Sequence, residues 1–385
     1  MTGAAASVVG IGQTEFSKGA GRSETQLAAE AIVAALHDAG LTTDDVDGLV
    51  SYTIDPVEET ELVRALGIPT VSWSSRVPYG GGGSQGVLQH ASAALSLGAA
   101  RVVVAYRACK ARTGARFGRP AVNRAATSSH TGTTAMQWAM PYGILTPAAW
   151  MSLNSTRYMH TYGVTSADFG RAVVQLRDYA ATNPAAHFYG RPITLDDHQN
   201  SRWIAEPAIR LFDCCQETDG AVALVITSAD RAADTQAPVD IAVTGSAAIF
   251  EEEVASNHYR PDLTRMDGSV TLAEQLFDAT GISRDEIDVA LIYDAFTPIL
   301  FMQLEALGFC KPGEAKDFVA DGAFGPTGRL PCNPNGGLIG EGYIHGLNLT
   351  VEAVRQLRGT AANQITGART ALVSASRTGV VLRAR

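Results

Sequence analysis

Two tyrosines stand where a chemically active side chain is expected. Tyr293 opens the stretch Tyr293-Asp294-Ala295-Phe296, directly after the apolar run VALI. Tyr343 follows the glycine-rich segment NPNGGLIGEG. A phenol can donate or accept a proton, so two phenols beside one substrate would provide general acid–base catalysis. Spacing alone favours a simpler interpretation for each, a half-buried ring whose hydroxyl is satisfied inside the protein.

A second glycine cluster, YGGGGSQG at 79–86, precedes a helical pattern in the first half of the chain. It contains the bare Gly-x-Gly-x-x-Gly pattern of dinucleotide-binding turns. That function needs an acidic residue at the end of the next strand, which here ends at Tyr106 and Arg107. We therefore do not expect a nicotinamide cofactor.

Both glycine clusters predict places where a ligand approaches the backbone at a helix start. Glycine permits close approach, and the free N–H groups of a helix start suit a partial negative charge. The backbone N–H groups at Gly80, Gly81 and Gly82, or at Gly342, are therefore candidate donors to an oxyanion.

The elements that must position these residues alternate between strand and helix patterns. Strand patterns cover 7–16, 46–53, 100–108, 220–229 and 239–250, and helical patterns cover 23–40 and 84–97. A helix is also expected after each of the two tyrosine segments. This alternation predicts an α/β fold in which helices layer against a sheet.

The sequence contains an internal repeat. The segment GLTTDDVDGLVSYT at 40–53 aligns without a gap with GISRDEIDVALIYD at 281–294, which pairs Tyr52 with Tyr293. In each half, a glycine cluster and a helix then lead to a similar segment, GAARVVVAY or GARTALVSA. An internal duplication explains both matches. We predict an N-terminal half at 1–235, with an insertion at 110–212 that covers one face of a sheet, and a C-terminal half at 236–385.

Composition argues against several classes of protein. The chain has 385 residues and a net charge of −9 without a cluster of Lys and Arg, so we expect no binding to nucleic acid or to an anionic membrane surface. No apolar run approaches the ~20 residues that span a bilayer, and the first residues do not resemble a secretory signal. Five cysteines without framework-like spacing predict a cytoplasmic location. No Cys/His motif predicts a metal site.

Taken together, the sequence resembles the thiolase superfamily, closest to its sterol-carrier-protein X and lipid-transfer-protein branch. The resemblance rests on the duplicated halves, the mid-chain insertion, the segment NPNGGLIGEGYIHG and the closing ALVSASRTGVVL, and it covers nearly the whole chain. It implies a thiolase fold: two βαβαβαββ halves in a layered αβαβα arrangement with a loop insertion.

The polar catalytic positions of the family carry tyrosine in this sequence. The signature NPxGGLIGxGHPxGATG holds up to Gly342, after which Tyr343 and Ile344 replace His-Pro. Where the family has Asn-Glu-Ala-Phe or His-Asp-x-Phe, the chain has the segment that begins at Tyr293.

Both reactive cysteines of the family are missing. The nucleophile would fall at about Gly80, and the second cysteine near Val373 or Ser374. Without a thiol at these positions no acyl-enzyme forms, so the thiolase route is excluded. Acyl transfer through another thiol would have to use Cys332.

The resemblance implies a different reaction. Actinobacterial proteins of this branch include steroid side-chain retro-aldolases, which cleave a β-hydroxyacyl-CoA thioester without a cysteine. The implied substrate is a steroid with a 17-hydroxyl and a three-carbon CoA thioester, and the products are a 17-ketosteroid and propionyl-CoA. No cofactor is expected, because the substrate itself carries coenzyme A. The alternative is a non-catalytic acyl-CoA-binding subunit that supports a hydratase.

Partners are also implied by the resemblance. Thiolase-like chains usually pair through their N-terminal halves, and relatives of this branch associate with a hydratase subunit that carries an OB-fold accessory domain. We therefore expect a homodimer within a hetero-oligomer, in addition to the steroid acyl-CoA substrate.

We predict Tyr293 and Tyr343 as the acid–base pair, without assigning either role. Holding a tyrosine as phenolate at pH 7, against its usual pKa of about 10, requires roughly 4 kcal/mol. Asp294 or Glu341 would oppose this as carboxylates, and a proton relay through neutral phenols is the alternative. Asp294 and His345 are supporting candidates, although His345 is expected on a helix, pointing away from Tyr343.

Overall fold

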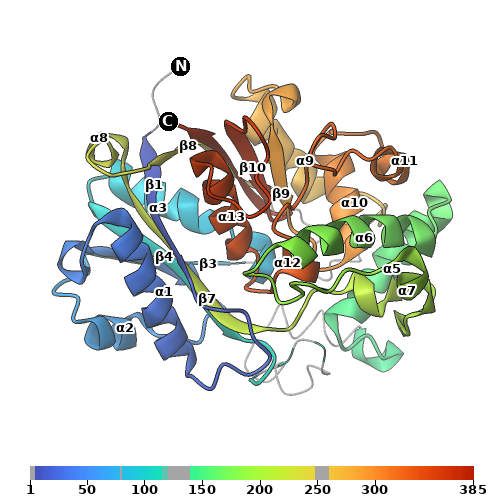
Figure 1. Ribbon diagram of the computed structural model, residues 1–385, viewed down its shortest axis with the longest axis horizontal. Coiled ribbons are helices and arrows are strands. Elements are labelled where there is room, and N and C mark those ends of the chain that lie inside the picture. The colour runs from blue at the N-terminus through green and yellow to red at the C-terminus, as the bar shows by residue number, and fades with distance from the viewer. Residues whose placement is uncertain (1–4, 79, 115, 117, 119–138, 248–259) are drawn as a thin grey trace.

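The computed structural model describes residues 5–78, 80–114, 116, 118, 139–247 and 260–385. Within these ranges the chain forms a mixed sheet of nine strands with helices on both sides, so the predicted α/β fold is confirmed (Figure 1). The nine strands are β1 (Ala6–Gln13), β2 (Gly48–Tyr52), β3 (Trp73–Val77), β4 (Val102–Lys110), β7 (Asp219–Ser228), β8 (Val239–Ser246), β9 (Val289–Ile292), β10 (Thr370–Ser374) and β11 (Thr378–Ala384). A separate two-stranded sheet joins β5 (Trp203–Ala205) to β6 (Ile209–Arg210).

The order of the strands reflects the repeat in the sequence. The sheet runs β3-β2-β4-β7-β1-β8-β11-β10-β9, and its two halves meet where β1 and β8 pair antiparallel. From this junction outward, each half has two antiparallel pairings and then a parallel pairing, β2 with β4 and β9 with β10, and in the first half β3 adds a second parallel pairing to β2. The predicted boundary at residue 235 lies just before β8 and stays a prediction.

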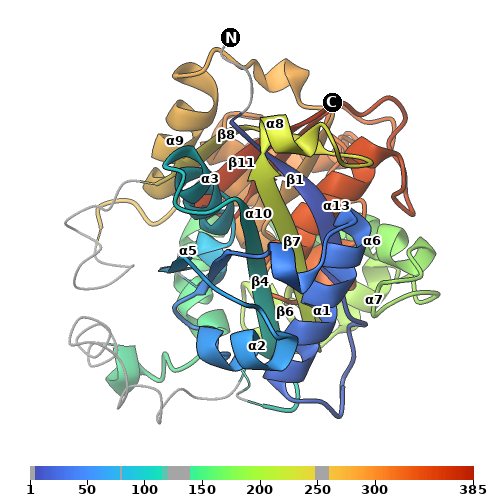
Figure 2. The same ribbon diagram turned by 90° about the vertical axis from the view of Figure 1, so that its left-hand side faces the viewer.

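Helices form three layers around the two halves of the sheet. The outer helix α1 (Glu24–Ala39) packs on β1, β4 and β7, with α2 (Glu59–Leu66) beside it. The middle helices α3 (Gly86–Ser96) and α13 (Leu347–Arg358) each contact strands of both halves (Figure 1 and Figure 2). On the far side lie α9 (Asp267–Ala273) and α10 (Thr297–Ala306). Shorter helices are α8 (Ala229–Ala232), α11 (Ala315–Ala320) and α12 (Gly337–Gly340).

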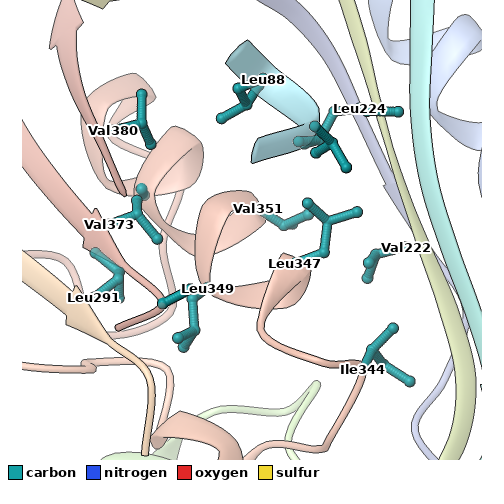
Figure 3. Close-up of a cluster of buried hydrophobic side chains, with 14 of the residues drawn as sticks. Leu88, Val222, Leu224, Leu291, Ile344, Leu347, Leu349, Val351, Val373 and Val380 are labelled. Atoms are coloured by element: carbon teal, nitrogen blue, oxygen red, sulfur yellow. The ribbon is translucent and has the colours of Figure 1, made fainter. Parts of the chain in front are cut away.

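The largest hydrophobic core surrounds the middle helices. Figure 3 shows α13 side chains between strands of the second half, which contribute Leu291, Val373 and Val380, and the β7 strand of the first half. The neighbouring residues Leu372 and Val381 point to the opposite face and join the core under α10. This alternation along β10 and β11 buries both faces of the sheet, as expected for a layered fold.

The insertion differs from the expected loop. Its described part contains the helices α5 (Pro147–Tyr162), α6 (Ser166–Thr182) and α7 (Leu195–Asn200). Each begins at a threonine, Thr146, Thr165 or Thr194, whose side chain accepts a hydrogen bond from the first turn. The insertion is therefore largely helical in the residues described. No helix in the described ranges combines the length and apolar character needed to cross a membrane.

Candidate active site

Tyr293 is fixed at the carboxyl end of β9. Its backbone N–H donates to the Ser374 carbonyl oxygen at 2.8 Å, and its carbonyl oxygen accepts a 2.7 Å hydrogen bond from the Gln303 side chain. Ser374 ends β10 and Gln303 lies on α10, so two elements hold the residue. The prediction that Tyr293 closes a strand and precedes a helix is confirmed.

Tyr343 lies in the turn between α12 and α13. Its backbone N–H donates to the hydroxyl of Thr218 at 2.9 Å, and it pairs with Glu217 in an isolated parallel bridge. Thr218 and Glu217 immediately precede β7. The turn that carries Tyr343 is therefore anchored to the first half of the sheet.

The two tyrosine hydroxyls meet. Their oxygens are 2.8 Å apart, a normal hydrogen-bond distance at which either hydroxyl can donate. The rings cross edge to face, with centroids 6.4 Å apart and an angle of 61° between the planes. Each residue is only 7% exposed. Two residues that are separated by 50 positions in sequence therefore form one hydrogen-bonded pair of phenols.

Glycines from both clusters make room for Tyr293. The turn Gly80–Gly83 precedes α3, and a Cβ atom added at Gly81 would lie 2.1 Å from the Tyr293 hydroxyl oxygen. A Cβ atom at Gly346, just before α13, would lie 2.9 Å from the Tyr293 ring. Neither contact is compatible with a larger residue, so both turns close around the tyrosine as the two glycine clusters suggested.

Asp294 links the two segments that carry the tyrosines. Its carboxylate oxygens accept hydrogen bonds from the backbone N–H groups of Leu338 at 2.8 Å and Ile339 at 3.4 Å, at the start of α12. Burial raises the pKa of Asp294 to about 7, although these N–H groups favour the charged form. Asp294 therefore joins the residue after Tyr293 to the start of α12, the helix that precedes the turn with Tyr343.

The surroundings of the pair disfavour a phenolate. Burial is the main cause that raises the pKa of Tyr293 and of Tyr343 above the usual value for tyrosine. Asp294 adds to the increase at Tyr293, and Tyr293 adds to it at Tyr343. Of the two mechanisms left open by the sequence, this environment favours a relay through neutral phenols.

Both tyrosines line a cavity of about 330 Å³. Its wall is largely apolar, with the side chains of Trp150, Met151, Met266, Phe296, Ile299 and Met302. Glu217, Arg260 and Arg377 also line it. A mostly apolar cavity with a few polar groups is typical of a site for an organic ligand.

Gly342 and Glu341, the two residues before Tyr343, contact groups outside the cavity. A Cβ atom at Gly342 would meet the Phe16 ring at 2.6 Å, so that glycine faces a packed side chain. The Glu341 carboxylate accepts hydrogen bonds from Asn335 at 2.6 Å and Asn348 at 2.7 Å and does not line the cavity. Glu341, which was considered only as a carboxylate that would oppose a phenolate, is instead held by these two asparagines.

The expected orientation of His345 is wrong. The residue precedes α13 instead of belonging to it, and its φ of 51° places it in the left-handed region. Its ring centroid is 4.9 Å from that of Tyr343. The left-handed backbone turns the ring back toward the tyrosine, which a helical spacing argument cannot anticipate.

Thiol chemistry finds no support in the site. Gly80 and Ser374, where the thiolase cysteines would fall, carry no thiol. Cys332 is fully buried, lies outside the cavity lining, and burial raises its pKa well above the usual value. Cys215 does line the cavity, but burial raises its pKa in the same way. Neither thiol is favoured as a thiolate nucleophile.

In the part of the chain that the structure describes, no group of three or more His, Cys, Asp and Glu side chains is placed to hold a metal ion. Near the tyrosines, Arg107 instead donates hydrogen bonds to Asp55 and to the ring of His345.

Sequence analysis missed several residues of the site. Arg107, which donates to the His345 ring at 3.0 Å, was noted only as the expected end of a strand, which in the structure continues to Lys110. Trp150, which lines the cavity, was not singled out. A Thr-Pro helix start at 146 and 147 is the signal that would have placed Trp150 on a helix. Nothing local marks Arg107, because its partner is 238 residues away.

Comparison with known proteins agrees with this arrangement. Residues 251–384 match the family model described as "Thiolase C-terminal domain-like". The chain is 49% identical to a 17-hydroxy-3-oxo-4-pregnene-20-carboxyl-CoA lyase of Mycobacterium tuberculosis, over 99% of this chain and 98% of that protein. It is 48% identical to a steroid side-chain-cleaving aldolase of Thermomonospora curvata, over 98% of this chain and 96% of that protein.

A solved structure shares the fold closely. The structure of an Ltp2-ChsH2(DUF35) aldolase superposes with a TM-score of 0.93 at 46% identity, covering 99% of this chain and 98% of that one. The predicted thiolase fold is therefore confirmed. With near-complete coverage at almost half identity, the chain belongs to the thiolase-like family that contains these side-chain-cleaving aldolases.

Proposed function

We propose that this chain is a retro-aldolase that cleaves a carbon–carbon bond of a β-hydroxyacyl-CoA thioester. The observation that carries the proposal is the Tyr293–Tyr343 pair, whose hydroxyls lie 2.8 Å apart on the wall of the cavity. The position of the thiolase nucleophile is Gly80, so covalent acyl transfer is not available there. Retro-aldol cleavage needs only proton transfer and stabilisation of an enolate.

In the proposed mechanism the two phenols pass protons in one direction. One tyrosine accepts the proton of the substrate β-hydroxyl while it gives its own proton to the other tyrosine. The carbon–carbon bond breaks, the hydroxyl-bearing carbon becomes a ketone, and the bonding electron pair goes to the thioester as an enolate. As this proton arrives, the second tyrosine gives its own proton to the α-carbon in the same concerted transfer, so it never carries two protons. Each phenol ends with one proton, so no free phenolate is required.

The enolate oxygen requires hydrogen-bond donors. We propose the backbone N–H groups of Gly80, Gly81 and Gly82, because Gly81 lies directly against the Tyr293 hydroxyl. Preorganised donors of this kind commonly provide the largest single contribution to catalysis. Gly342 is the weaker candidate, since it packs against Phe16.

The proposed substrate is a steroid with a 17-hydroxyl and a three-carbon CoA thioester, and the products are a 17-ketosteroid and propionyl-CoA. The names of the two relatives at 49% and 48% identity support this assignment. The cavity supports it as well, because Trp150, Met151 and Met302 offer an apolar surface to a hydrocarbon ring system. We propose no cofactor beyond the coenzyme A of the substrate.

Replacing single hydroxyls tests the tyrosine pair. We expect Tyr343→Phe and Tyr293→Phe each to lower kcat by about 10²–10⁴-fold, the usual contribution of a general acid or base. The matched control is Tyr179→Phe, because Tyr179 is also buried and its hydroxyl donates to the Phe324 carbonyl at 2.8 Å, but it does not line the cavity. The measurement is release of the ketosteroid and of propionyl-CoA. Wild-type rates in both cavity variants would contradict the proposal.

The same assay separates the enzyme from the alternative, a non-catalytic acyl-CoA-binding subunit. The hydroxylated thioester is incubated with the purified chain, with the partner alone and with both. An enzyme yields a ketone and a shorter CoA ester in a reaction that depends on Tyr343. A binding subunit yields neither product, or yields products that Tyr343→Phe leaves unchanged.

We further propose a partner protein. The similar solved structure is named as an aldolase of Ltp2 with ChsH2, a DUF35 protein, which supports a hetero-oligomer for this chain. A hydratase subunit with an OB-fold accessory domain, a homodimer within the assembly and a cytoplasmic location remain predictions. Co-expression followed by size-exclusion chromatography with light scattering gives the stoichiometry.

A further inference from the structure

Arg107, on β4, forms a buried ion pair beside the tyrosines. The residue is 2% exposed, and Nη1 donates to Asp55 Oδ2 at 2.8 Å. The same carboxylate also accepts from the backbone N–H groups of Ala108 at 3.1 Å and Val57 at 2.9 Å. Asp55 therefore compensates the charge of Arg107, and its own hydrogen-bonding capacity is well used.

Another donor of this guanidinium points at His345. Arg107 Nε lies 3.0 Å from His345 Nδ1, and His345 is 2% exposed. A guanidinium has only donors, so Nδ1 must act as the acceptor and carries no proton. The single ring proton of His345 then resides on Nε2. A second proton on Nδ1 would break the contact and place a new cation beside a buried one.

His345 in turn contacts the catalytic pair proposed above. Its ring centroid lies 4.9 Å from that of Tyr343, at an angle of 65°, and the Tyr343 hydroxyl is 2.8 Å from that of Tyr293. A continuous series of contacts therefore runs from Asp55 through Arg107 and His345 to the two phenols.

We propose that Arg107 is a positioning residue that holds His345 as a neutral imidazole, protonated on Nε2, against Tyr343. The proposal rests on the function assigned above to the tyrosine pair. A neutral ring orients Tyr343 without adding charge. An imidazolium at this distance would favour a phenolate at Tyr343 and disrupt a relay that depends on two neutral phenols.

Two further titratable side chains near this contact, one beside His345 and one beside Arg107, stay uncharged near neutral pH. Tyr52, on β2, lies with its ring centroid 6.5 Å from the His345 ring, and burial raises its pKa. Cys109, on β4 near Arg107, also has its pKa raised by burial. Asp55 stays paired to Arg107, and the guanidinium is the cation that donates to Nδ1 of His345.

The direct test is nuclear magnetic resonance of the full chain labelled with ¹⁵N-histidine. The chain has eight histidines, and the His345→Asn variant identifies the His345 signals by their loss. Asparagine tolerates a left-handed backbone, so this variant keeps the turn. We expect the His345 signals to show the neutral Nε2–H form at every pH from about 6 to 8.5, across the ordinary histidine pKa of about 6.5. Titration in this range, or a proton on Nδ1, would overturn the proposal.

Kinetics of Arg107 variants give the second readout. We expect Arg107→Met to lower kcat by about 10-fold or more with a small change in KM, because positioning is lost. It should also introduce an acid limb near pH ~6.5, as His345 becomes free to accept a proton. Adding His345→Asn should remove that limb. A loss of stability with an unchanged pH profile would show that the role is structural only.

A double variant that removes both charges of the ion pair controls for loss of stability. Arg107→Met leaves Asp55 buried and unpaired, a change that is expected to destabilise the fold. Asp55→Asn combined with Arg107→Gln leaves no buried charge and still exposes Nδ1 of His345 to protonation. The resonance measurement does not depend on turnover, so it distinguishes failure of this inference from failure of the proposed function.

Discussion

Because Gly81 has no Cβ atom, the Tyr293 hydroxyl can lie directly against its backbone. A methyl group there would lie 2.1 Å from that oxygen, so Gly81→Ala must displace the phenol. A shift of about 1 Å in a reacting group can cost about 10²-fold in rate. We expect Gly81→Ala to fold and to lose activity of this order, measured as kcat/KM for thioester cleavage.

The control for this variant is Gly19→Ala. No atom lies within 4 Å of a Cβ built at Gly19, so the same chemical change meets open space. Full activity of Gly19→Ala together with a weakened Gly81→Ala would support the steric argument. Equal activity of both variants would show that Tyr293 can move without consequence.

Single residues differed in how far the sequence could identify them. Tyr293 and Tyr343 were predicted because they replace polar catalytic residues of a known signature. Arg107 was not, since its contact with His345 spans 238 residues. The predicted orientation of His345 was wrong, because its left-handed φ of 51° cannot be derived from helical periodicity.

At the scale of elements, Asp294 holds the end of β9 against the start of α12. Asparagine in its place keeps one acceptor oxygen but turns an amide N–H₂ toward the backbone N–H of Leu338 or Ile339. We expect Asp294→Asn to lower the free energy of unfolding by about 1–3 kcal/mol. Activity should fall as well, because the segments that carry the two tyrosines lose their link.

Asp168→Asn provides the matched control. Asp168 also accepts backbone hydrogen bonds at a helix start, from Thr165 at 2.8 Å, but α6 carries it away from the tyrosines. Thermal unfolding and turnover of both variants are compared. We expect the Asp168→Asn control to keep full activity. If Asp294→Asn loses stability and also keeps full activity, then Asp294 does not position the site.

Elements with clear start signals were predicted well. Helix α1 begins after Ser23, whose side chain accepts from Gln26, and ends at Gly40 with a left-handed φ of 67°. The helices of the insertion were missed, although Thr165 and Asp168 form the same type of cap. Glycine, proline and aromatic residues around them hid the periodicity, and contacts with the rest of the fold decide the structure there.

At the scale of the whole molecule, buried carboxyl groups make stability depend on pH. Burial raises the pKa of Asp294 to about 7 and that of Glu352 to about 8. Between the unfolded and folded pKa values the folded state binds more protons, so stability falls as pH rises. From pH 6.5 to 8 we expect a loss of about 2 kcal/mol, or about 2–4 °C in Tm. His90 and His187 have lowered pKa values, so their contribution to stability increases as pH rises. This contribution changes only below about pH 6.5.

The Glu352→Gln variant isolates the contribution of the Glu352 carboxyl group to the pH dependence of stability. Glu352 lies on α13 and accepts a hydrogen bond from Gln356 at 2.8 Å, away from the tyrosines. Calorimetric Tm values across pH 6.5–8 should decline less steeply in this variant than in the wild-type chain. An identical decline in both would mean that Glu352 does not retain its proton in the folded state.

The arrangement of the whole sheet was only partly accessible from sequence. The repeat and the family resemblance predicted two similar halves, and the strand order agrees with them. The pairing of β1 with β8 could not be predicted from local sequence, because Ala6, Ser7 and Val8 pair with residues that are more than 200 positions away. Such long-range pairing depends on which apolar faces remain to be covered once the helices have packed.

The pseudo-symmetry of the sheet gives Tyr293 a counterpart. Tyr52 ends β2 as Tyr293 follows β9, but the Tyr52 hydroxyl faces the carbonyl oxygen of Ser84 at 3.4 Å, whereas Tyr293 meets Tyr343. The two halves thus inherited the same phenol and used it differently: one fills space in the core, and the other gained a proton-exchanging neighbour. Equivalent phenols at the strand ends of the two halves therefore have different hydrogen-bond partners, a main-chain carbonyl in one half and a second phenol in the other.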